Sequence, residues 1–252
     1  MITIKNEDSI NKMKKAGYIV AKVLISLKEM IEPGISLKEL DSFAEKMIRQ
    51  MGAVPSFKGY GGFPGSICAS VNEEVIHGIP GKRRLKEGEI ISIDAGAFID
   101  GFHGDSAFTA AVGKISEDKQ RLIDITEASF YEGLKMAKAG NHLGDISHSI
   151  EKKVLAAGFS VVKEFVGHGI GRELHEDPAV PNYGPPGRGV KLQSGMTLAI
   201  EPMVNMGTES ILILDDGWTV VTKDKQPSAH YEHTILITDE EPVILTKGDW
   251  FD

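Results

Sequence analysis

The stretch Ile90-Ile-Ser-Ile-Asp-Ala-Gly-Ala-Phe-Ile-Asp-Gly-Phe-His-Gly-Asp-Ser-Ala-Phe-Thr109 has the pattern of two strands joined at Asp100-Gly101. Asp-Gly is a favoured two-residue turn of a β-hairpin. Because side chains alternate along a strand, Asp94 and Asp105 become diagonal neighbours on one face, about 7–8 Å apart at Cα. Two carboxylates aimed at one point repel each other unless a positive charge lies there. The hairpin therefore predicts a divalent metal site.

The turn also predicts the cross-strand pairs Ile99 with Phe102, Gly96 with Asp105, and Asp94 with Ala107. The alternative interpretation is an exposed hairpin with two solvated aspartates. The apolar run that precedes Asp94 argues against exposure, because such a run is typical of a buried strand.

Three segments of the second half add side chains that can bind metals. His168 lies in Phe165-Val-Gly-His-Gly-Ile-Gly171, where glycines let backbone and ligands approach closely. Glu201 ends one apolar strand and Glu232 begins another, and a buried carboxylate needs a partner. A lone histidine is more often structural, but an oxygen-rich set with one nitrogen suits Mn, Fe, Co or Zn. Four carboxylates largely balance two such ions. The predicted ligands are Asp94, Asp105, His168, Glu201 and Glu232.

Two more histidines precede the strand acids, His77 before Asp94 and His175 before Glu201. Each can reach the same centre as a proton donor or as a partner of an oxyanion. The alternative is a loop histidine with no chemical role. We interpret the other histidines in that way: His103, His142, His148, His230 and His233.

The glycine-rich stretch 58–65 lacks the strand-loop-helix context of a nucleotide-binding loop. We interpret it as a loop that lines a substrate pocket. The wall candidates there are Tyr60, Phe63 and Cys68, although ordinary packing explains these three equally well.

Apolar residues recur at helical spacing in four segments, 8–31, 36–52, 117–138 and 143–157. Pro33-Gly34 ends the first helix, and Ser36 with Glu39 forms a capping box that begins the second. Short apolar runs at 66–71 and 89–99 predict strands, and most of the chain after Phe159 has the pattern of strands and loops.

The chain also contains an internal similarity. Residues 34–52 resemble residues 140–158, and residues 85–94 resemble residues 192–201, at nearly the same offset. Amphipathic helices can resemble each other by chance, but the order and spacing are kept as well. We expect one domain built from duplicated α+β halves, with a site between them that receives an acid from each half.

Composition restricts the class of protein. The chain has 252 residues, 41% of them hydrophobic, and a formal net charge of −8. This acidic balance argues against nucleic acid or an anionic membrane as the partner. One cysteine excludes an internal disulfide, and neither a signal peptide nor a long apolar segment is visible. We expect a cytoplasmic protein and, since no obligate interface is indicated, a monomer.

Six motifs stand in one order along the chain: Val71-Asn-Glu-Glu-Val-Ile-His-Gly-Ile-Pro80, Asp94-Ala-Gly96, Gly104-Asp105, Gly167-His-Gly-Ile-Gly-Arg172, Ala199-Ile-Glu-Pro202 and Tyr231-Glu-His-Thr234. Over about residues 8–238 they resemble the methionine aminopeptidases of type I, the bacterial-like class without an N-terminal extension. The resemblance implies the α/β pita-bread fold with its internal pseudo-twofold repeat. It divides the single catalytic domain 1–252 into halves at about 8–112 and 117–238.

The resemblance also implies roles for individual residues. Asp94 and Asp105 would bind one metal ion. Asp105, His168, Glu201 and Glu232 would bind the other, with Asp105 and Glu232 bridging the two ions.

The resemblance assigns the substrate contacts as well. His77 would contact substrate near the scissile nitrogen, His175 would stabilise the carbonyl oxygen, and Glu201 is our candidate for the group that accepts the proton. The methionine pocket would be lined by Tyr60, Phe63, Cys68 and Trp218. Leu174 departs from the pattern, since an aromatic residue is common there, and this affects the shape of the pocket.

The predicted function is hydrolytic removal of the N-terminal methionine from peptides and nascent chains with a small second residue. A dinuclear metal site bridged by carboxylates would activate the water. Contact with the ribosome suits a nascent-chain substrate, but no motif indicates it. One alternative is an Xaa-Pro peptidase, which usually carries an additional N-terminal domain. The other is a metal-free peptide-binding module, which would have lost ligands.

Overall fold

The computed structural model describes residues 2–249. Its helices are α1 (Glu7–Met30), α2 (Leu37–Gln50), α3 (Glu117–Met136) and α4 (Leu143–Ala156), with a short 3-10 turn at Tyr60–Gly62. All four predicted helices are confirmed, with ends within two residues of the prediction. Within the described residues, no helix is both long enough and apolar enough to cross a membrane.

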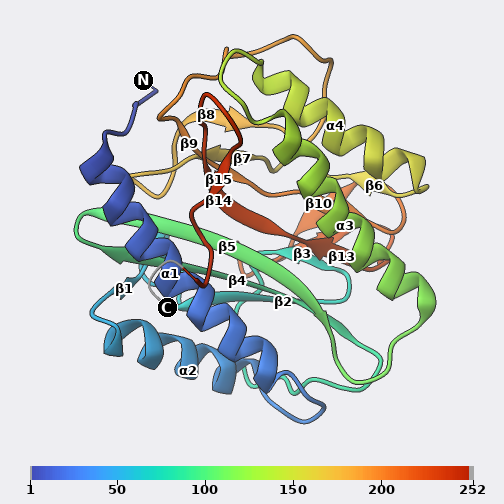
Figure 1. Cartoon of the computed structure of the whole chain (residues 1–252). Coiled ribbons are helices and arrows are strands. Elements are labelled where there is room, and N and C mark those ends of the chain that lie inside the picture. The colour runs from blue at the N-terminus through green and yellow to red at the C-terminus, as the bar shows by residue number, and fades with distance from the viewer. Residues whose placement is uncertain (1, 250–252) are drawn as a thin grey trace.

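The strands form one large antiparallel sheet and two small ones (Figure 1). The large sheet has the order β1-β4-β5-β14-β9-β7-β8, with β2 added to β4 and β15 added to β14. Its strands are β1 (Val54–Pro55), β2 (Ile67–Val71), β4 (Ile90–Ile99), β5 (Phe102–Ala111), β7 (Gly167–Gly169), β8 (Glu176–Val180), β9 (Thr197–Ile200), β14 (Glu232–Leu236) and β15 (Val243–Ile244). The small sheets contain β13 (Ser228–His230), β10 (Met203–Asn205) and β6 (Ser160–Val161), and β11 (Ile211–Ile213), β12 (Val220–Thr222) and β3 (Glu74–Ile76).

The predicted hairpin forms as β4 and β5. Its observed pairs include Ile99 with Phe102, Gly96 with Asp105, and Asp94 with Ala107. Asp100 and Gly101 both have positive φ, 53° and 83°, as the tight two-residue turn requires. The local turn chemistry therefore sets the register of the longest strand pair in the molecule.

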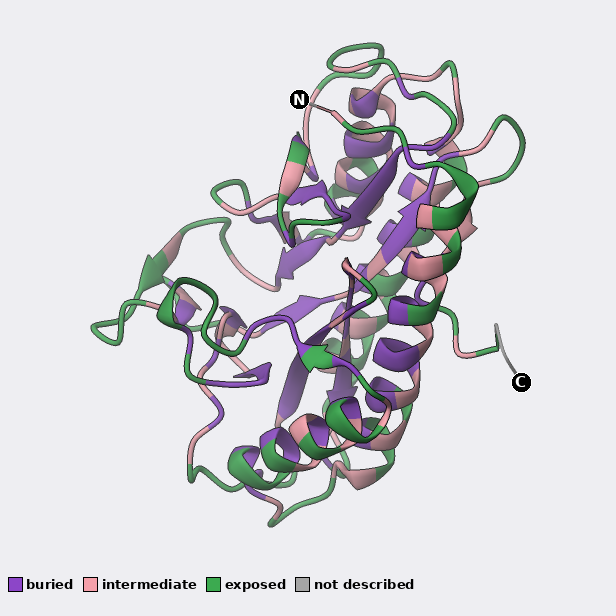
Figure 2. Cartoon of the chain, turned by 90° about the vertical axis from the view of Figure 1, so that its left-hand side faces the viewer, coloured by how far each residue is buried: buried purple, intermediate pink, exposed green. Residues whose placement is uncertain are grey.

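Two apolar cores hold the helices against the sheet. In the first core, Val20, Val23 and Leu27 of α1 pack with the β4 isoleucines Ile91 and Ile93. The second core joins α3 and α4 to β9 and β14. Figure 2 shows most of the strands buried while the helices expose their outer faces. This one-sided burial explains the helical apolar spacing of the sequence.

The second half repeats local hydrogen bonds of the first half. The amide of Gly34 donates to the oxygen of Leu85 at 2.8 Å, and the amide of Gly140 donates to the oxygen of Leu192 at 2.9 Å. Both α2 and α4 begin with a capping box. On the basis of these repeated contacts we propose one catalytic domain, whose two halves lie at about 8–112 and 117–238.

Candidate active site

One cavity of about 140 Å³ gathers every side chain that the sequence predicts for the site. Its lining contains His77, Asp94, Asp105, His168, His175, Glu201, Glu232, Tyr60, Phe63, Cys68 and Trp218, together with Phe57 and Leu174. The residues come from both halves of the chain. The location of the predicted residues thus agrees with a single centre, while their chemical roles stay predictions.

The hairpin positions the two aspartates. Asp94 lies on β4 beside Cys68 of β2, and Asp105 lies on β5. Thr234 links β5 to β14. Its hydroxyl accepts from the backbone amide of Asp105 at 3.0 Å and donates to the backbone oxygen of Asp105 at 2.8 Å. Asp105 is therefore held by its own hairpin and by the neighbouring strand.

His168 depends on the glycines on either side of it. A Cβ on Gly167 would lie 2.3 Å from the oxygen of Ala199, and one on Gly169 would lie 2.1 Å from the oxygen of Asp177. Only glycine lets these strands approach so closely. The Nδ1–H of His168 donates to the oxygen of Gly169 at 2.8 Å, which leaves the Nε2 lone pair directed at the acids.

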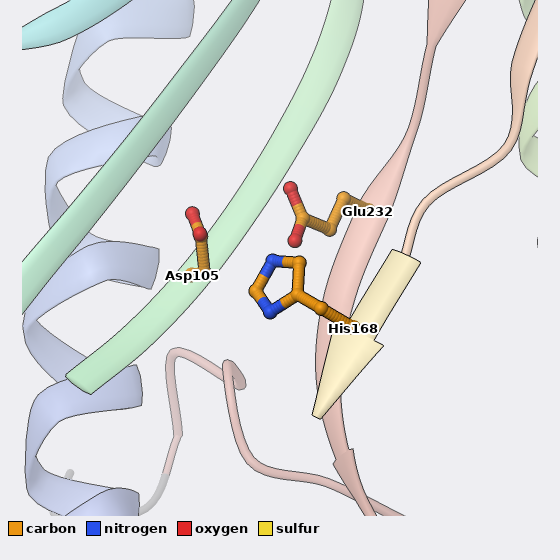
Figure 3. A group of neighbouring side chains, drawn as sticks. All are labelled: Asp105, His168 and Glu232. Carbon is orange, nitrogen blue, oxygen red and sulfur yellow. The ribbon is translucent and has the colours of Figure 1, made fainter. Parts of the chain in front are cut away.

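The two glutamates complete the group. Glu201 follows β9, and its Oε1 lies 3.5 Å from Nε2 of His168. Glu232 begins β14, where Ser106 donates its hydroxyl to the Glu232 backbone oxygen at 2.5 Å. Figure 3 shows Asp105, His168 and Glu232 pointing toward one another from three different strands. Their ligand atoms all lie within 4.8 Å of one another.

Burial makes this acid cluster costly without a cation. Burial raises the pKa of Asp105 to about 7. Burial and the neighbouring acids, Asp105 first among them, raise the pKa of Asp94, Glu201 and Glu232 well above the usual range. Burial lowers the pKa of His168 to about 4, so its imidazole is neutral at pH 7 and can act as a ligand.

The unpaired atoms of the cluster test whether metal ions fit there. Oδ1 of Asp94, Oδ1 of Asp105 and Oε1 of Glu232 are buried and have no hydrogen-bond partner in the described part of the chain. Such atoms are rare in folded proteins and need an explanation. Oxygen donors with one neutral imidazole are the ligands that Mn, Fe, Co and Zn accept. The donor set and its unpaired oxygens therefore fit divalent metal ions.

The remaining predicted residues form the wall and mouth of the cavity. The half-exposed Tyr60 shares a hydrogen bond of 2.8 Å between its hydroxyl and Nδ1 of His175. The rings of Phe63 and Trp218 meet edge to face at 5.2 Å. His77 has φ of 58°, a strained conformation for a residue with a side chain. Burial lowers the pKa of His77 to about 4, so its imidazole is neutral at pH 7.

The sequence interpretation missed two residues of this region, Phe57 and His230, and it named Leu174 only for its effect on the shape of the pocket. Phe57 and Leu174 line the cavity, and both belong to the apolar cluster behind it. His230, interpreted from the sequence as a histidine without a role, is buried beside Glu201 and Glu232. Its spacing of two residues from Glu232 was a usable signal, since residues i and i+2 of a strand share a face.

Comparisons with known proteins agree with this site. Residues 11–239 match the model of metallopeptidase family M24. The chain is 57% identical over 246 residues to a methionine aminopeptidase of Clostridium perfringens, covering 98% of this chain and 99% of that protein. It is 56% identical over 247 residues to methionine aminopeptidase 1 of Bacillus subtilis, covering 98% of this chain and 100% of that protein.

Solved structures agree as well. The crystal structure of a Thermotoga maritima methionine aminopeptidase superimposes with a TM-score of 0.97 at 48% identity, over 98% of this chain and 100% of that one. A prolidase from Pyrococcus furiosus has a TM-score of 0.79 at 23% identity and matches over 65% of its own length, which shows a shared fold alone. The predicted pita-bread fold is confirmed, and the chain belongs to metallopeptidase family M24 and, within it, to the methionine aminopeptidases.

Proposed function

We propose that this chain removes the N-terminal methionine from peptides and nascent chains with a small second residue, by means of two divalent ions. The observation that carries the proposal is the convergence of Asp105, His168 and Glu232, whose donor atoms lie within 4.8 Å of one another. The same cavity has an apolar wall, so the acids and a slot for an unbranched thioether side chain adjoin each other.

The family resemblance implies two ion positions among these donors. Asp94 and Asp105 would hold one ion; Asp105, His168, Glu201 and Glu232 would hold the other, with Asp105 and Glu232 shared. Divalent ions bound there would lower the pKa of water from about 15.7 toward about 7 and polarise the scissile carbonyl. Which metal is physiological is open among Co, Mn, Fe and Zn.

The chain's own side chains would move the protons and hold the charge. Glu201 would accept the proton of the attacking water, since its carboxylate lines the cavity beside His168. If the Tyr60 hydroxyl donates to Nδ1 of His175, the proton of that imidazole resides on Nε2. Nε2–H can then donate to the carbonyl oxygen as negative charge develops.

The substrate would be oriented by both ends of the cavity. A free α-amine near Asp94 explains why the enzyme would act only at the chain terminus. His77 would contact the peptide near the scissile nitrogen, while Phe63, Cys68 and Trp218 would enclose the methionine side chain. The preference for a small second residue rests on the family resemblance.

Hydrolysis of four peptides by the Co²⁺-loaded protein tests the proposal. We expect rapid cleavage of Met-Ala-Ser and little cleavage of Ala-Ala-Ser or acetyl-Met-Ala-Ser, because the latter two lack the methionine side chain or the free amine. Met-Leu-Ser, with a larger second residue, should be cleaved more slowly than Met-Ala-Ser. Equal rates on the first three peptides would refute the assignment.

We also propose where the reaction takes place and in what assembly. A nascent-chain substrate suits a cytoplasmic enzyme, and the acidic net charge of −8 does not favour nucleic acid as a partner. We also propose that the protein acts as a monomer. Co-sedimentation with ribosomes, and the mass in solution by light scattering, would test ribosome contact and the oligomeric state separately.

A further inference from the structure

A second buried imidazole, that of His230, faces the same acids as His168. The residue is only 2% exposed, and its Nε2 has no hydrogen-bond partner among the residues that the structure describes. Nε2 lies 3.8 Å from Oε2 of Glu201 and 3.9 Å from Oε2 of Glu232. Because buried polar atoms are nearly always paired, an unpaired nitrogen aimed at two acids indicates a task.

The sheet holds His230 firmly in this position. The hydroxyl of Thr109, on β5, accepts from the His230 amide at 2.8 Å and donates to the His230 oxygen at 2.8 Å. Thr109 is itself bonded to Ser92 of β4 at 2.8 Å, and His230 pairs with Met203 of β10. The imidazole is therefore positioned by the hairpin that also carries the two aspartates.

Glu201 lies between the two imidazoles. Its Oε1 is 3.5 Å from Nε2 of His168, and its Oε2 is 3.8 Å from Nε2 of His230. The second separation exceeds a hydrogen bond, but a small rotation of the Glu201 carboxylate can close it. The two oxygens of Glu201 thus have different neighbours, and only Oε1 faces the proposed ligand His168.

We propose that His230 is a positioning residue, whose Nε2–H donates to Oε2 of Glu201 and thereby directs Oε1 toward the metal ion. The inference rests on the proposed function, because it assumes that Glu201 binds an ion. Carboxylates that ligate metals are commonly held by such a hydrogen bond, and its loss weakens binding or activity about 10–100-fold.

Three substitutions at this position test the role of the donor. His230→Leu removes the N–H group at similar size, His230→Ala removes it and leaves space, and His230→Gln keeps an N–H donor without an imidazole. Co²⁺ affinity by calorimetry and the visible absorption of bound Co²⁺ are the readouts, beside kcat on Met-Ala-Ser. His148→Gln is the matched control, because α4 contributes no residue to the cavity lining.

We expect the Leu and Ala variants to bind Co²⁺ about 10–100-fold more weakly, with a changed absorption band, and the Gln variant to stay within a few-fold of the original protein. Unchanged affinity and spectrum in the Leu or Ala variant would overturn the inference. Equal loss in the Gln variant would also overturn it, because direct ligation by the imidazole would then be the better explanation. If the unaltered protein binds no Co²⁺ and cleaves no methionyl peptide, the proposed function itself fails.

Discussion

The two sides of the cavity are built in different ways. Asp94 and Asp105, the hairpin pair, lie on adjacent strands joined by a two-residue turn. His168, Glu201 and Glu232, the dispersed set, lie on or next to three strands that meet only through long-range pairing. The hairpin pair thus owes its geometry to local turn chemistry, whereas the dispersed set owes it to the packing of the whole second half.

The two sides of the cavity should therefore respond differently to substitutions. A turn that forms locally can tolerate a change far away, but a strand that approaches another strand through glycine contacts cannot tolerate an added atom. Both sides nevertheless share one buried acid cluster, in which burial and the charge of Asp105 raise the pKa of Asp94, Glu201 and Glu232. Substitutions on the two sides should therefore separate effects on the stability of the fold from effects on metal binding and turnover.

The largest expected loss of activity comes from substitutions in the dispersed set. Glu201→Gln keeps the size of the side chain but removes the proton acceptor, so kcat on Met-Ala-Ser should fall about 10²–10⁴-fold. His168→Ala should abolish turnover by removing the single predicted nitrogen ligand. Steady-state kinetics with saturating Co²⁺ measures both, with His148→Gln as control. Near-normal turnover in either variant would contradict the assigned roles.

Substitutions in the hairpin pair should have a smaller effect, which is on the binding of metal ions. Asp94→Asn removes a ligand of one proposed ion only, so the number of Co²⁺ ions bound tightly should fall from about two to about one. Asp105→Asn removes a shared ligand and should weaken both ions. Calorimetric titration gives the stoichiometry. Identical titration curves for the two variants would contradict the proposal that Asp105 bridges and Asp94 does not.

The pH dependence of metal binding follows from the raised pKa values. With the pKa of Asp105 raised to about 7, and those of the other three acids raised as well, the metal-free site holds protons near pH 6 that an ion must displace. Co²⁺ affinity should therefore rise with pH between about 5.5 and 7.5, about tenfold per pH unit for each proton released. Calorimetry in buffers of different ionisation enthalpy counts these protons, and a flat affinity profile would speak against the buried cluster.

The smallest effects are expected when one glycine on each side of the cavity is replaced by alanine. Gly101 has φ of 83° at the hairpin tip, so Gly101→Ala should lower stability by about 1–2 kcal/mol and leave Co²⁺ affinity nearly unchanged. Gly167→Ala would bring a Cβ within 2.3 Å of the Ala199 oxygen, so it should cost about 1–3 kcal/mol and weaken Co²⁺ binding by displacing His168. Urea unfolding and Co²⁺ titration distinguish the two. The reverse pattern would mean that the dispersed set is the more tolerant side.

The sequence predicted the local structure well because local rules determine it. The capping box at Ser36 and Glu39 forms as expected, and the pairs around Asp100-Gly101 have the expected register. Both features depend on residues close together in the chain, whose side chains and φ values encode the outcome. The family motifs further predicted which residues would meet, and these residues line one cavity.

The tertiary structure decided which residues far apart in the sequence come close together. The spacing of His230 from Glu232 indicates a shared face, but only the tertiary structure places His230 beside Glu201, where Thr109 on β5 binds its backbone on both sides. Phe57 likewise joins the cavity wall through packing. Alternation within a strand can be inferred from neighbours in sequence. Which strand lies opposite, and how closely, follows from the long-range burial of the complete sheet.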